Sequence, residues 1–263
     1  MSADSEPPAI IDLHSHLVPG VDDGSRSVTE SVETLTGLRR EGVTALVTTP
    51  HLLLPHLPTH AAIQQELDLH RRGFDQLLRA WESRPDLPAI YLGQEIWAPD
   101  AGTVRRVVGR RDVGLPGRYL LVEFGFDLQG NHNDVVREVL DAGRAIVIAH
   151  PERYRYLPGH DPIEVMERWQ ELGALLQVNV GSLTGHYEKS SPGAEQLAWQ
   201  MVSRDLVDVL ATDHHGARRS GVSPGEALNA LIARGQRTLA ERAMAEVPKR
   251  IVADDLPASR LPR

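Results

Sequence analysis

The chain has 263 residues, a formal net charge of −8 and no cysteine. The absence of cysteine excludes a disulfide framework, a thiolate nucleophile and a Cys-ligated zinc site. The acidic balance disfavours the broad basic surface that binds nucleic acid, so we expect no nucleic-acid partner, although a few local arginines could hold a short anionic substrate.

Neither the N-terminal segment nor any apolar run predicts contact with a membrane. Residues 1–8 are polar and acidic, without the basic and apolar regions of a signal peptide. No apolar run approaches the roughly 20 residues that span a bilayer. We therefore expect a cytoplasmic protein without membrane insertion. Its length permits one large α/β domain or two small ones, and we expect one domain over residues 9–253 between flexible tails at 1–8 and 254–263.

Short β-branched, apolar runs alternate with longer segments of helical periodicity along the chain. The runs predict seven strands, at residues 10–13, 45–48, 89–92, 119–123, 145–149, 175–180 and 207–211. The longer segments predict helices at residues 29–41, 61–82, 134–142, 163–172, 193–204, 224–234 and 239–245. This alternation indicates right-handed βαβ units and parallel pairing. Seven such units favour a closed barrel, although an open doubly wound sheet gives a similar pattern.

Imidazole and carboxylate side chains follow the ends of most predicted strands. Asp12, His14 and His16 alternate at the end of the first strand, so they share one face. The remaining candidates are Asp22, His51, Glu95, Glu123, His150, Asp213 and His215. In a parallel barrel these positions converge at the C-terminal face, where such folds hold their active sites. Six of the seven predicted strands contribute such a group, which chance does not readily explain.

The donor types limit the metal that such a site can hold. Imidazoles and carboxylates without a thiolate suit Mn²⁺, Fe²⁺ or Zn²⁺. Nine such donors, with Asp12 behind them, are too many for one tetrahedral ion, so we expect two or three ions bridged by shared carboxylates. Clustered ions of this kind activate water and hold the oxygens of a phosphate ester, which predicts a phosphatase. Taken singly, Asp12 could instead be a cap and Glu123 could pair with an arginine.

Five segments carry a resemblance to a known family. They are Asp12-Leu-His-Ser-His16 with residues 17–24, Thr49-Pro-His51, Gly93-Gln-Glu95, His150-Pro-Glu-Arg-Tyr154 and residues 179–185. The first resembles the opening motif of the PHP (polymerase and histidinol phosphatase) superfamily. Together they resemble its branch of manganese-dependent protein-tyrosine phosphatases, which are encoded with bacterial capsule and exopolysaccharide genes. The resemblance covers most of the chain.

The resemblance implies a single distorted (β/α)7 TIM-like barrel of the PHP type with a trinuclear site. Carried over by position, the three ions would be bound by His14, His16, Glu95 and Asp213, by Glu95, Glu123 and His150, and by Asp22, His51 and His215. Asp12 would orient the first group. Arg153 would hold the phosphate together with Arg219 or its neighbour Arg218. This chain departs from the family pattern at His214, where a small residue is common, and in the spacing to the following arginine.

The implied activity is hydrolysis of phosphotyrosine in a protein, with Mn²⁺ as cofactor and a role in regulating capsule or exopolysaccharide synthesis. The implied partner is a bacterial tyrosine kinase of polysaccharide export, and a homo-oligomer is compatible with the sequence. The alternatives are a histidinol-phosphate or other small-molecule PHP phosphatase, a PHP exonuclease, and a catalytically inactive regulatory module. The segments 150–154 and 181–185 favour the tyrosine branch, and the complete ligand set argues against an inactive module.

Overall fold

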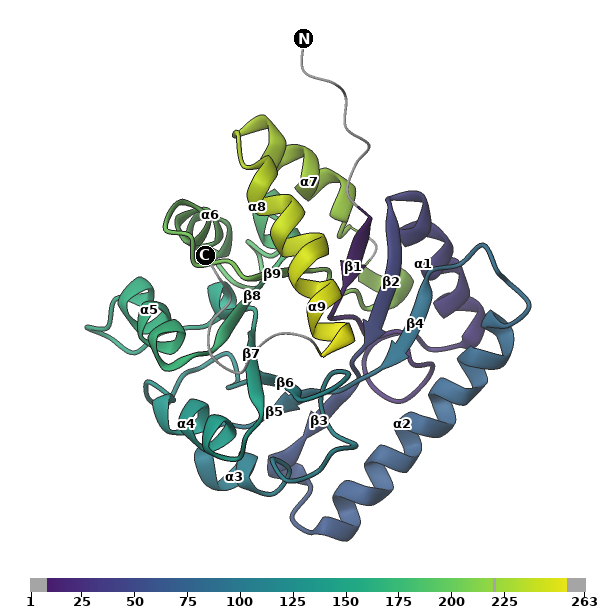
Figure 1. The fold of residues 1–263 in the computed structure, drawn as a ribbon, viewed down its shortest axis with the longest axis horizontal. Coiled ribbons are helices and arrows are strands. Elements are labelled where there is room, and N and C mark those ends of the chain that lie inside the picture. Colours follow the sequence, from purple (N-terminus) through teal and green to yellow (C-terminus); the bar gives the residue numbers. More distant parts are fainter. Residues whose placement is uncertain (1–8, 220, 255–263) are drawn as a thin grey trace.

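The strands are all parallel and form two sheets in the computed structural model. The structure describes residues 9–219 and 221–254, without the side chains of residues 218 and 219. The smaller sheet, in the order β1-β2-β4, contains Ile10–Asp12 (β1), Val43–Thr48 (β2) and Ala89–Leu92 (β4). The larger sheet, in the order β3-β5-β6-β7-β8-β9, contains His51–Leu53 (β3), Glu95–Trp97 (β5), Tyr119–Glu123 (β6), Ala145–Ala149 (β7), Leu175–Asn179 (β8) and Val209–Ala211 (β9). Figure 1 shows these strands surrounded by helices. The predicted parallel pairing is confirmed.

Two predicted strands resume after a short interruption, which the sequence interpretation missed. β2 is followed by β3 after Thr49 and Pro50, and β4 is followed by β5 after Gly93 and Gln94. Proline cannot donate to a strand ladder, so the pairing breaks at Pro50. It resumes with His51 opposite Glu95. Both side chains, expected at the ends of the second and third predicted strands, therefore begin paired strands and are fixed as neighbours.

The segment that follows β1 lies beside the segment that follows β9. The Asp213 amide donates to the carbonyl of His14 (2.8 Å), and the His16 amide donates to the carbonyl of His214 (2.8 Å). Ser15 and His214 form an isolated parallel bridge. The strands thus form two parallel sheets with backbone contacts between the segments that follow β1 and β9, and the closed barrel stays a prediction.

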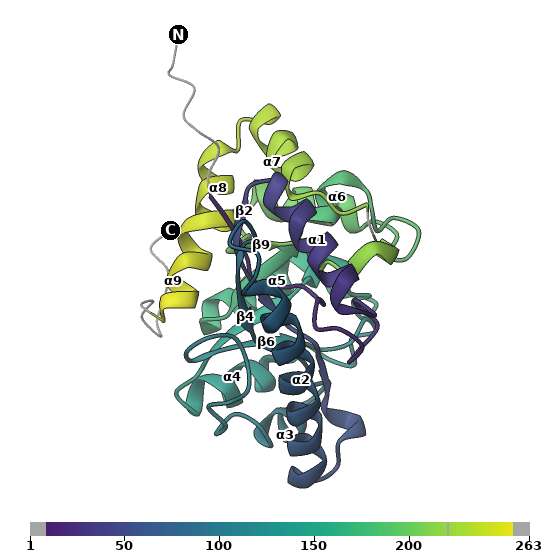
Figure 2. The same ribbon diagram turned by 90° about the vertical axis from the view of Figure 1, so that its right-hand side faces the viewer.

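Helices cover the outside of the sheets. Val28–Arg40 (α1) and His60–Trp81 (α2) pack against each other beside the smaller sheet (Figure 2). The larger sheet is followed by Ala101–Arg105 (α3), Asn133–Asp141 (α4), Pro162–Leu172 (α5) and Ala194–Ser203 (α6). Pro224–Ala233 (α7), Arg237–Glu241 (α8) and Val247–Ala253 (α9) come last. None of the described helices has the length and apolar character needed to cross a membrane.

The helix boundaries follow local capping chemistry. The side chains of Ser27, Thr59 and Asp161 accept hydrogen bonds from first-turn amides of α1, α2 and α5. Six predicted helices match within one residue at each end. The seventh prediction, 239–245, was wrong in extent, because α8 runs through the π-helical segment Arg242–Glu246 into α9. The short helix α3 was not predicted.

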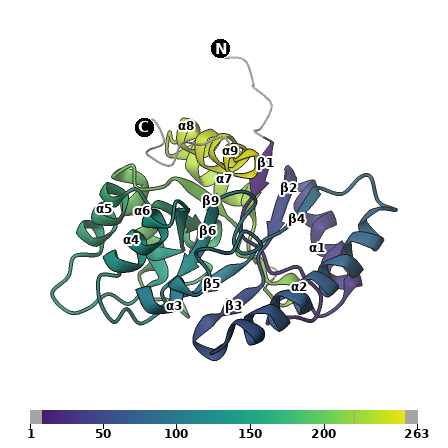
Figure 3. The same cartoon turned by 60° about the horizontal axis from the view of Figure 1, so that its bottom comes forward.

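Apolar side chains fill both faces of the parallel strands. Along β6, Leu120 and Val122 face the outer core beneath the helices, whereas Leu121 faces an inner core with Val147. Ile251 of α9 belongs to this inner core, and Figure 3 shows α7, α8 and α9 gathered over one side of the strands. Asp254, predicted to lie in a tail, is the C-cap of α9, and its carboxylate accepts from the Arg118 amide just before β6. The remaining tail residues lie outside the described part.

Candidate metal centre

The predicted ligands gather at the carboxyl ends of the strands. His14 and His16 follow β1, His51 and Glu95 begin β3 and β5, Glu123 ends β6, His150 follows β7, and Asp213 and His215 follow β9. A cavity of about 580 Å³ opens among them. Its lining includes Asp22, His51, Glu95, Glu123, His150, Asp213 and His215. His14 and His16 lie fully buried directly behind Glu95 and Asp213.

Four donor atoms form a compact cluster in the middle of this group. His14 Nε2 lies 3.2 Å from His16 Nε2, 3.3 Å from Glu95 Oε2 and 3.4 Å from Asp213 Oδ1. His16 Nε2 lies 3.4 Å from Glu95 Oε2 and 3.3 Å from Asp213 Oδ1. Donors around one tetrahedral ion with bonds of about 2.0–2.1 Å are themselves about 3.3–3.4 Å apart. The separations among His14 Nε2, His16 Nε2 and Glu95 Oε2 therefore fit three ligands of a single divalent cation, and Asp213 Oδ1 lies within 3.4 Å of both imidazoles.

The ring nitrogens that face away from this cluster have acceptors of their own. His14 Nδ1 lies 2.9 Å from Gln177 Oε1, His16 Nδ1 lies 2.8 Å from Asp22 Oδ2, and His215 Nδ1 lies 2.8 Å from the carbonyl of Asp213. A proton held at each Nδ1 leaves the lone pair of Nε2 directed toward the cluster. Metal-binding histidines are oriented in this way by acceptors behind them.

The carboxylates give the cluster an excess of negative charge. Burial lowers the pKa of His14 and His16, but the nearby Glu95, Asp213 and Asp22 outweigh it and raise both. Burial also opposes ionisation of Asp213, yet the surrounding imidazoles and Arg153 hold its pKa well below its usual range. A field that favours a proton on buried imidazoles favours a cation at the same place.

Glu95 is placed between several imidazoles. Its Oε1 lies 2.8 Å from His150 Nε2, and its Oε2 lies 2.9 Å from His51 Nδ1. Oε2 is fully buried without a hydrogen-bond partner, although three imidazole nitrogens lie within 3.4 Å of it. Burial, followed by the charge of Glu95, raises the pKa of Glu123 to about 8. Glu95 Oε2 has no hydrogen-bond partner and Glu95 lies near the Glu123 carboxylate, as expected of a carboxylate that bridges two cations.

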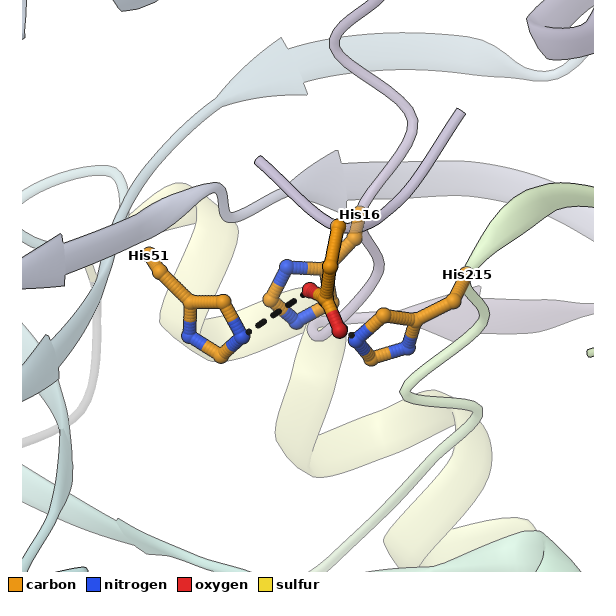
Figure 4. A group of neighbouring side chains, drawn as sticks. His16, His51 and His215 are labelled. Atoms are coloured by element: carbon orange, nitrogen blue, oxygen red, sulfur yellow. Dashed lines mark ion pairs between the residues drawn. The ribbon is translucent and has the colours of Figure 1, made fainter. Parts of the chain in front are cut away.

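Asp23, rather than Asp22, lies between His51 and His215. Asp23 Oδ1 is 3.4 Å from His51 Nε2 and 3.3 Å from His215 Nε2, and dashed lines mark these ion pairs in Figure 4. The expected grouping of Asp22 with these two histidines is therefore corrected. Asp22 instead supports His16 from behind and accepts from the Gly24 amide (2.9 Å). The two aspartates lie in a loop, where strand alternation cannot tell them apart.

Asp12 lies behind the cluster and does not line the cavity. Its Oδ2 accepts from the Thr212 hydroxyl (2.6 Å) and its Oδ1 accepts from the Thr212 amide (2.9 Å) and the His14 amide (3.3 Å). Burial raises the pKa of Asp12 to about 6, although these hydrogen bonds oppose the shift. Asp12 thus holds the segment after β1 against the segment after β9.

Two buried amides on β8 were missed by the sequence interpretation. Gln177, which accepts from His14, donates through Nε2 to Asn179 Oδ1 (2.7 Å). Asn179 then donates through Nδ2 to Asp213 Oδ2 (2.9 Å). Both amide side chains are fully buried. The sequence could have identified both residues, because they lie two apart in an otherwise apolar strand and strand residues two apart share a face.

Arg153 lies beside the cluster and lines the cavity. Its Nη1 donates to Asp213 Oδ2 (2.8 Å), and its side chain is only 8% exposed. The guanidinium lies between the rings of Phe126 (4.9 Å) and Tyr187 (4.1 Å). The other predicted arginine, Arg219, ends the segment Gly216–Arg219, but its side chain lies outside the described part of the structure.

His214 does not join the candidate ligands. Its Nδ1 accepts from the Gly216 amide (3.0 Å), and burial lowers its pKa to about 4.

Two candidate ligands have left-handed backbones, His150 with φ 36° and Asp213 with φ 50°. Non-glycine residues pay a conformational cost there, and such positions cluster at functional sites. The positive φ angles of His150 and Asp213 occur in the turns after β7 and β9, which direct both side chains into the cavity.

Comparison with known proteins identifies a family model and named relatives that match most of the chain. The family model "Capsular polysaccharide synthesis, CpsB/CapC" matches residues 10–253. The tyrosine-protein phosphatase YwqE of Bacillus subtilis is 28% identical over 226 residues, covering 84% of each chain. The tyrosine-protein phosphatase CpsB of Streptococcus pneumoniae is 26% identical over 257 residues, covering 94% of this chain and all of the relative.

A solved structure described under both of these names shares the fold. It superimposes with a TM-score of 0.73 at 24% identity and covers 97% of this chain and 100% of its own. The proteins are described there as unique metal-dependent tyrosine phosphatases. The match of the family model extends over nearly the whole chain and includes every candidate ligand. This chain belongs to the CpsB/CapC family of capsular polysaccharide synthesis.

Proposed function

We propose that this chain is a metal-dependent phosphatase that hydrolyses phosphotyrosine in proteins and thereby regulates capsule or exopolysaccharide synthesis. The observation that carries the proposal is that the His14, His16 and Glu95 donor atoms lie at coordination spacing, with Asp213 and Arg153 beside them. The names of the relatives YwqE and CpsB support the same activity. A histidinol-phosphate phosphatase and an inactive module are less well supported, because these relatives are named as tyrosine phosphatases and the donor set is complete.

The donor groups suggest how two or three ions would be held. The first would be bound by His14, His16, Glu95 and Asp213, and the second by Glu95, Glu123 and His150. His51, His215 and Asp23 would hold the third, with Asp23 in the place first expected for Asp22. We propose Mn²⁺, while the same donors also suit Fe²⁺ and Zn²⁺. When bound, such ions lower the pKa of water and stabilise charge on phosphate oxygens.

The protein itself would bind and orient the phosphate. The Arg153 guanidinium offers a planar pair of N–H donors that matches two phosphate oxygens. Its stacking between two rings and its contact with Asp213 hold it at the cavity wall before substrate arrives. A tyrosine phenolate leaves readily because its pKa is about 10, so strong general-acid assistance is unnecessary. Arg219 is proposed as a second phosphate-binding residue.

Several broader proposals accompany this function. We propose that the two sheets form one distorted (β/α)7 barrel within a single domain of residues 9–253, supported by the backbone contacts between residues 14–16 and 213–214. A bacterial tyrosine kinase of polysaccharide export is the proposed substrate protein. We further propose a cytoplasmic location, in keeping with the lack of a spanning helix among the described residues.

A substrate comparison tests the proposed activity. With Mn²⁺ present, we expect turnover of a phosphotyrosine peptide to exceed that of histidinol phosphate and of a short oligonucleotide by at least about tenfold in kcat/KM, which corresponds to about 1.4 kcal/mol in transition-state binding. Steady-state kinetics on the three substrates under one set of conditions provides the measurement. Preference for histidinol phosphate would instead support the small-molecule alternative, and activity on none of the three would support the inactive module.

A further inference from the structure

The loop after β6 turns a phenylalanine into the cavity. Glu123 is followed by Phe124, Gly125 and Phe126, and strand alternation alone would place both rings on one side. Gly125 has a φ of 88°, and a Cβ there would lie 3.0 Å from the Trp97 Nε1 atom. Phe124 is buried at 2% exposure, whereas Phe126 is 38% exposed and lines the cavity. The turn at Gly125 therefore places the Phe124 ring in the core and the Phe126 ring in the cavity wall.

Contacts with the loop after β7 hold Phe126 in place. The Arg155 amide donates to the carbonyl of Phe126 (2.7 Å), and the Leu128 amide donates to the carbonyl of Arg155 (3.2 Å). Asp127 and Arg155 also form a bridge and an ion pair. These contacts join the loop that carries Phe126 to the loop that carries Arg153, so the ring and the guanidinium keep a fixed relation.

The ring of Phe126 lies beside the chemical centre but contributes no ligand. Its centroid is 4.9 Å from Arg153 Cζ and 5.9 Å from the ring of His150, with 16° between the Phe126 and His150 planes. The cavity wall also includes Val21, Leu53 and Leu57. A phosphate held by Arg153 would thus place its ester group beside apolar side chains, one of which presents an aromatic ring.

We propose that Phe126 determines specificity by packing against the aromatic ring of an aryl phosphate whose phosphate contacts Arg153. This inference rests on the proposed function and adds the residue that selects an aryl ester over an alkyl ester. An aromatic ring packed against another gains buried apolar area and a favourable ring–ring geometry. A phosphoserine side chain offers neither, because it has one methylene and no ring.

The test compares Phe126→Ala with Phe126→Tyr and with Tyr91→Ala. Tyr91 is a matched control, since its side chain is 39% exposed on β4 and it does not line the cavity. Binding of benzylphosphonate and methylphosphonate is measured by calorimetry on the Mn²⁺-loaded proteins. In the same samples, kcat/KM is determined for phosphotyrosine and phosphoserine peptides of one sequence.

In Phe126→Ala we expect benzylphosphonate affinity and phosphotyrosine kcat/KM to fall roughly 5- to 30-fold. Methylphosphonate affinity and phosphoserine kcat/KM should change less than about twofold, because the contacts with Asp213 and Tyr187 still hold Arg153 in place. Phe126→Tyr and Tyr91→Ala should both behave like the wild type. Equal losses for aryl and methyl ligands, or no loss for either, would overturn the role of Phe126. A wild type that fails to hydrolyse the phosphotyrosine peptide would contradict the proposed function instead, and the phosphonate comparison would still judge the role of Phe126.

Discussion

Replacing Glu95 with glutamine is expected to lower kcat/KM for a phosphotyrosine peptide by roughly 10³-fold or more, since several kcal/mol of charge stabilisation depend on the bound ions. Glu95 contacts His14, His16, His51 and His150, and its Oε2 has no hydrogen-bond partner. An amide has nearly the same shape as a carboxylate but lacks the negative charge that a bridge between cations requires. We therefore expect the metal content of Glu95→Gln to fall together with its activity.

The measurement pairs steady-state kinetics with elemental analysis of the same samples. Glu138→Gln is a suitable control, because Glu138 pairs with the exposed Arg105 on the outside of the molecule. This control should retain metal and activity, and both variants should retain the circular dichroism of the wild type. If Glu95→Gln keeps wild-type metal content and kcat/KM, Glu95 is not a bridging ligand.

Arg153→Ala should lower kcat/KM by roughly 10²–10³-fold, the size of the loss when one preorganised donor to a developing negative charge is removed. Its bound metal should remain unchanged, because a guanidinium cannot ligate and Asp213 keeps the hydrogen bond from Asn179. Arg153→Lys should recover only part of the loss, since an ammonium lacks the planar pair of donors. These effects separate phosphate binding from metal binding.

If Arg153 merely paired with a surface carboxylate, it would contribute little to phosphate binding. Its partner is instead Asp213, which is 2% exposed and belongs to the central cluster. Arg168→Ala is a matched control, since Arg168 forms an exposed pair with Glu171 on α5. Kinetics with metal quantification on the three arginine variants provides the measurement. Unchanged kcat/KM in Arg153→Ala would remove this residue from the site.

The sequence predicted those features of the fold that depend on a long, repeated pattern. The strands at 119–123 and 145–149 are continuous apolar runs, and they match β6 and β7 at both ends. The continuations β3 and β5 have only three residues each, too few to show a period. Their starting residues, His51 and Glu95, were nevertheless selected as candidates, because position after a strand end signals a shared edge in a parallel fold.

The features that the sequence did not predict depend on turns and long-range contacts. Whether Asp22 or Asp23 contacts the His51 ring depends on the loop that Gly24 closes, where a Cβ would collide with the His16 backbone at 2.0 Å. The support that Gln177 gives to His14 joins residues 163 positions apart. Phe126 reaches the cavity only because Gly125 adopts a positive φ. A search for period and residue type alone cannot find such contacts.

The most direct test of the account is turnover of a phosphotyrosine peptide by metal-depleted and reloaded protein. The central claim is that the His, Asp and Glu cluster acts through bound divalent cations. After exhaustive chelation, with metal removal verified by elemental analysis, kcat/KM should fall by at least about 10³-fold, and added Mn²⁺ should restore it. A thiol-alkylating reagent should have no effect on the chemistry, because the chain has no cysteine. Full activity in protein shown to be free of metal would contradict the account.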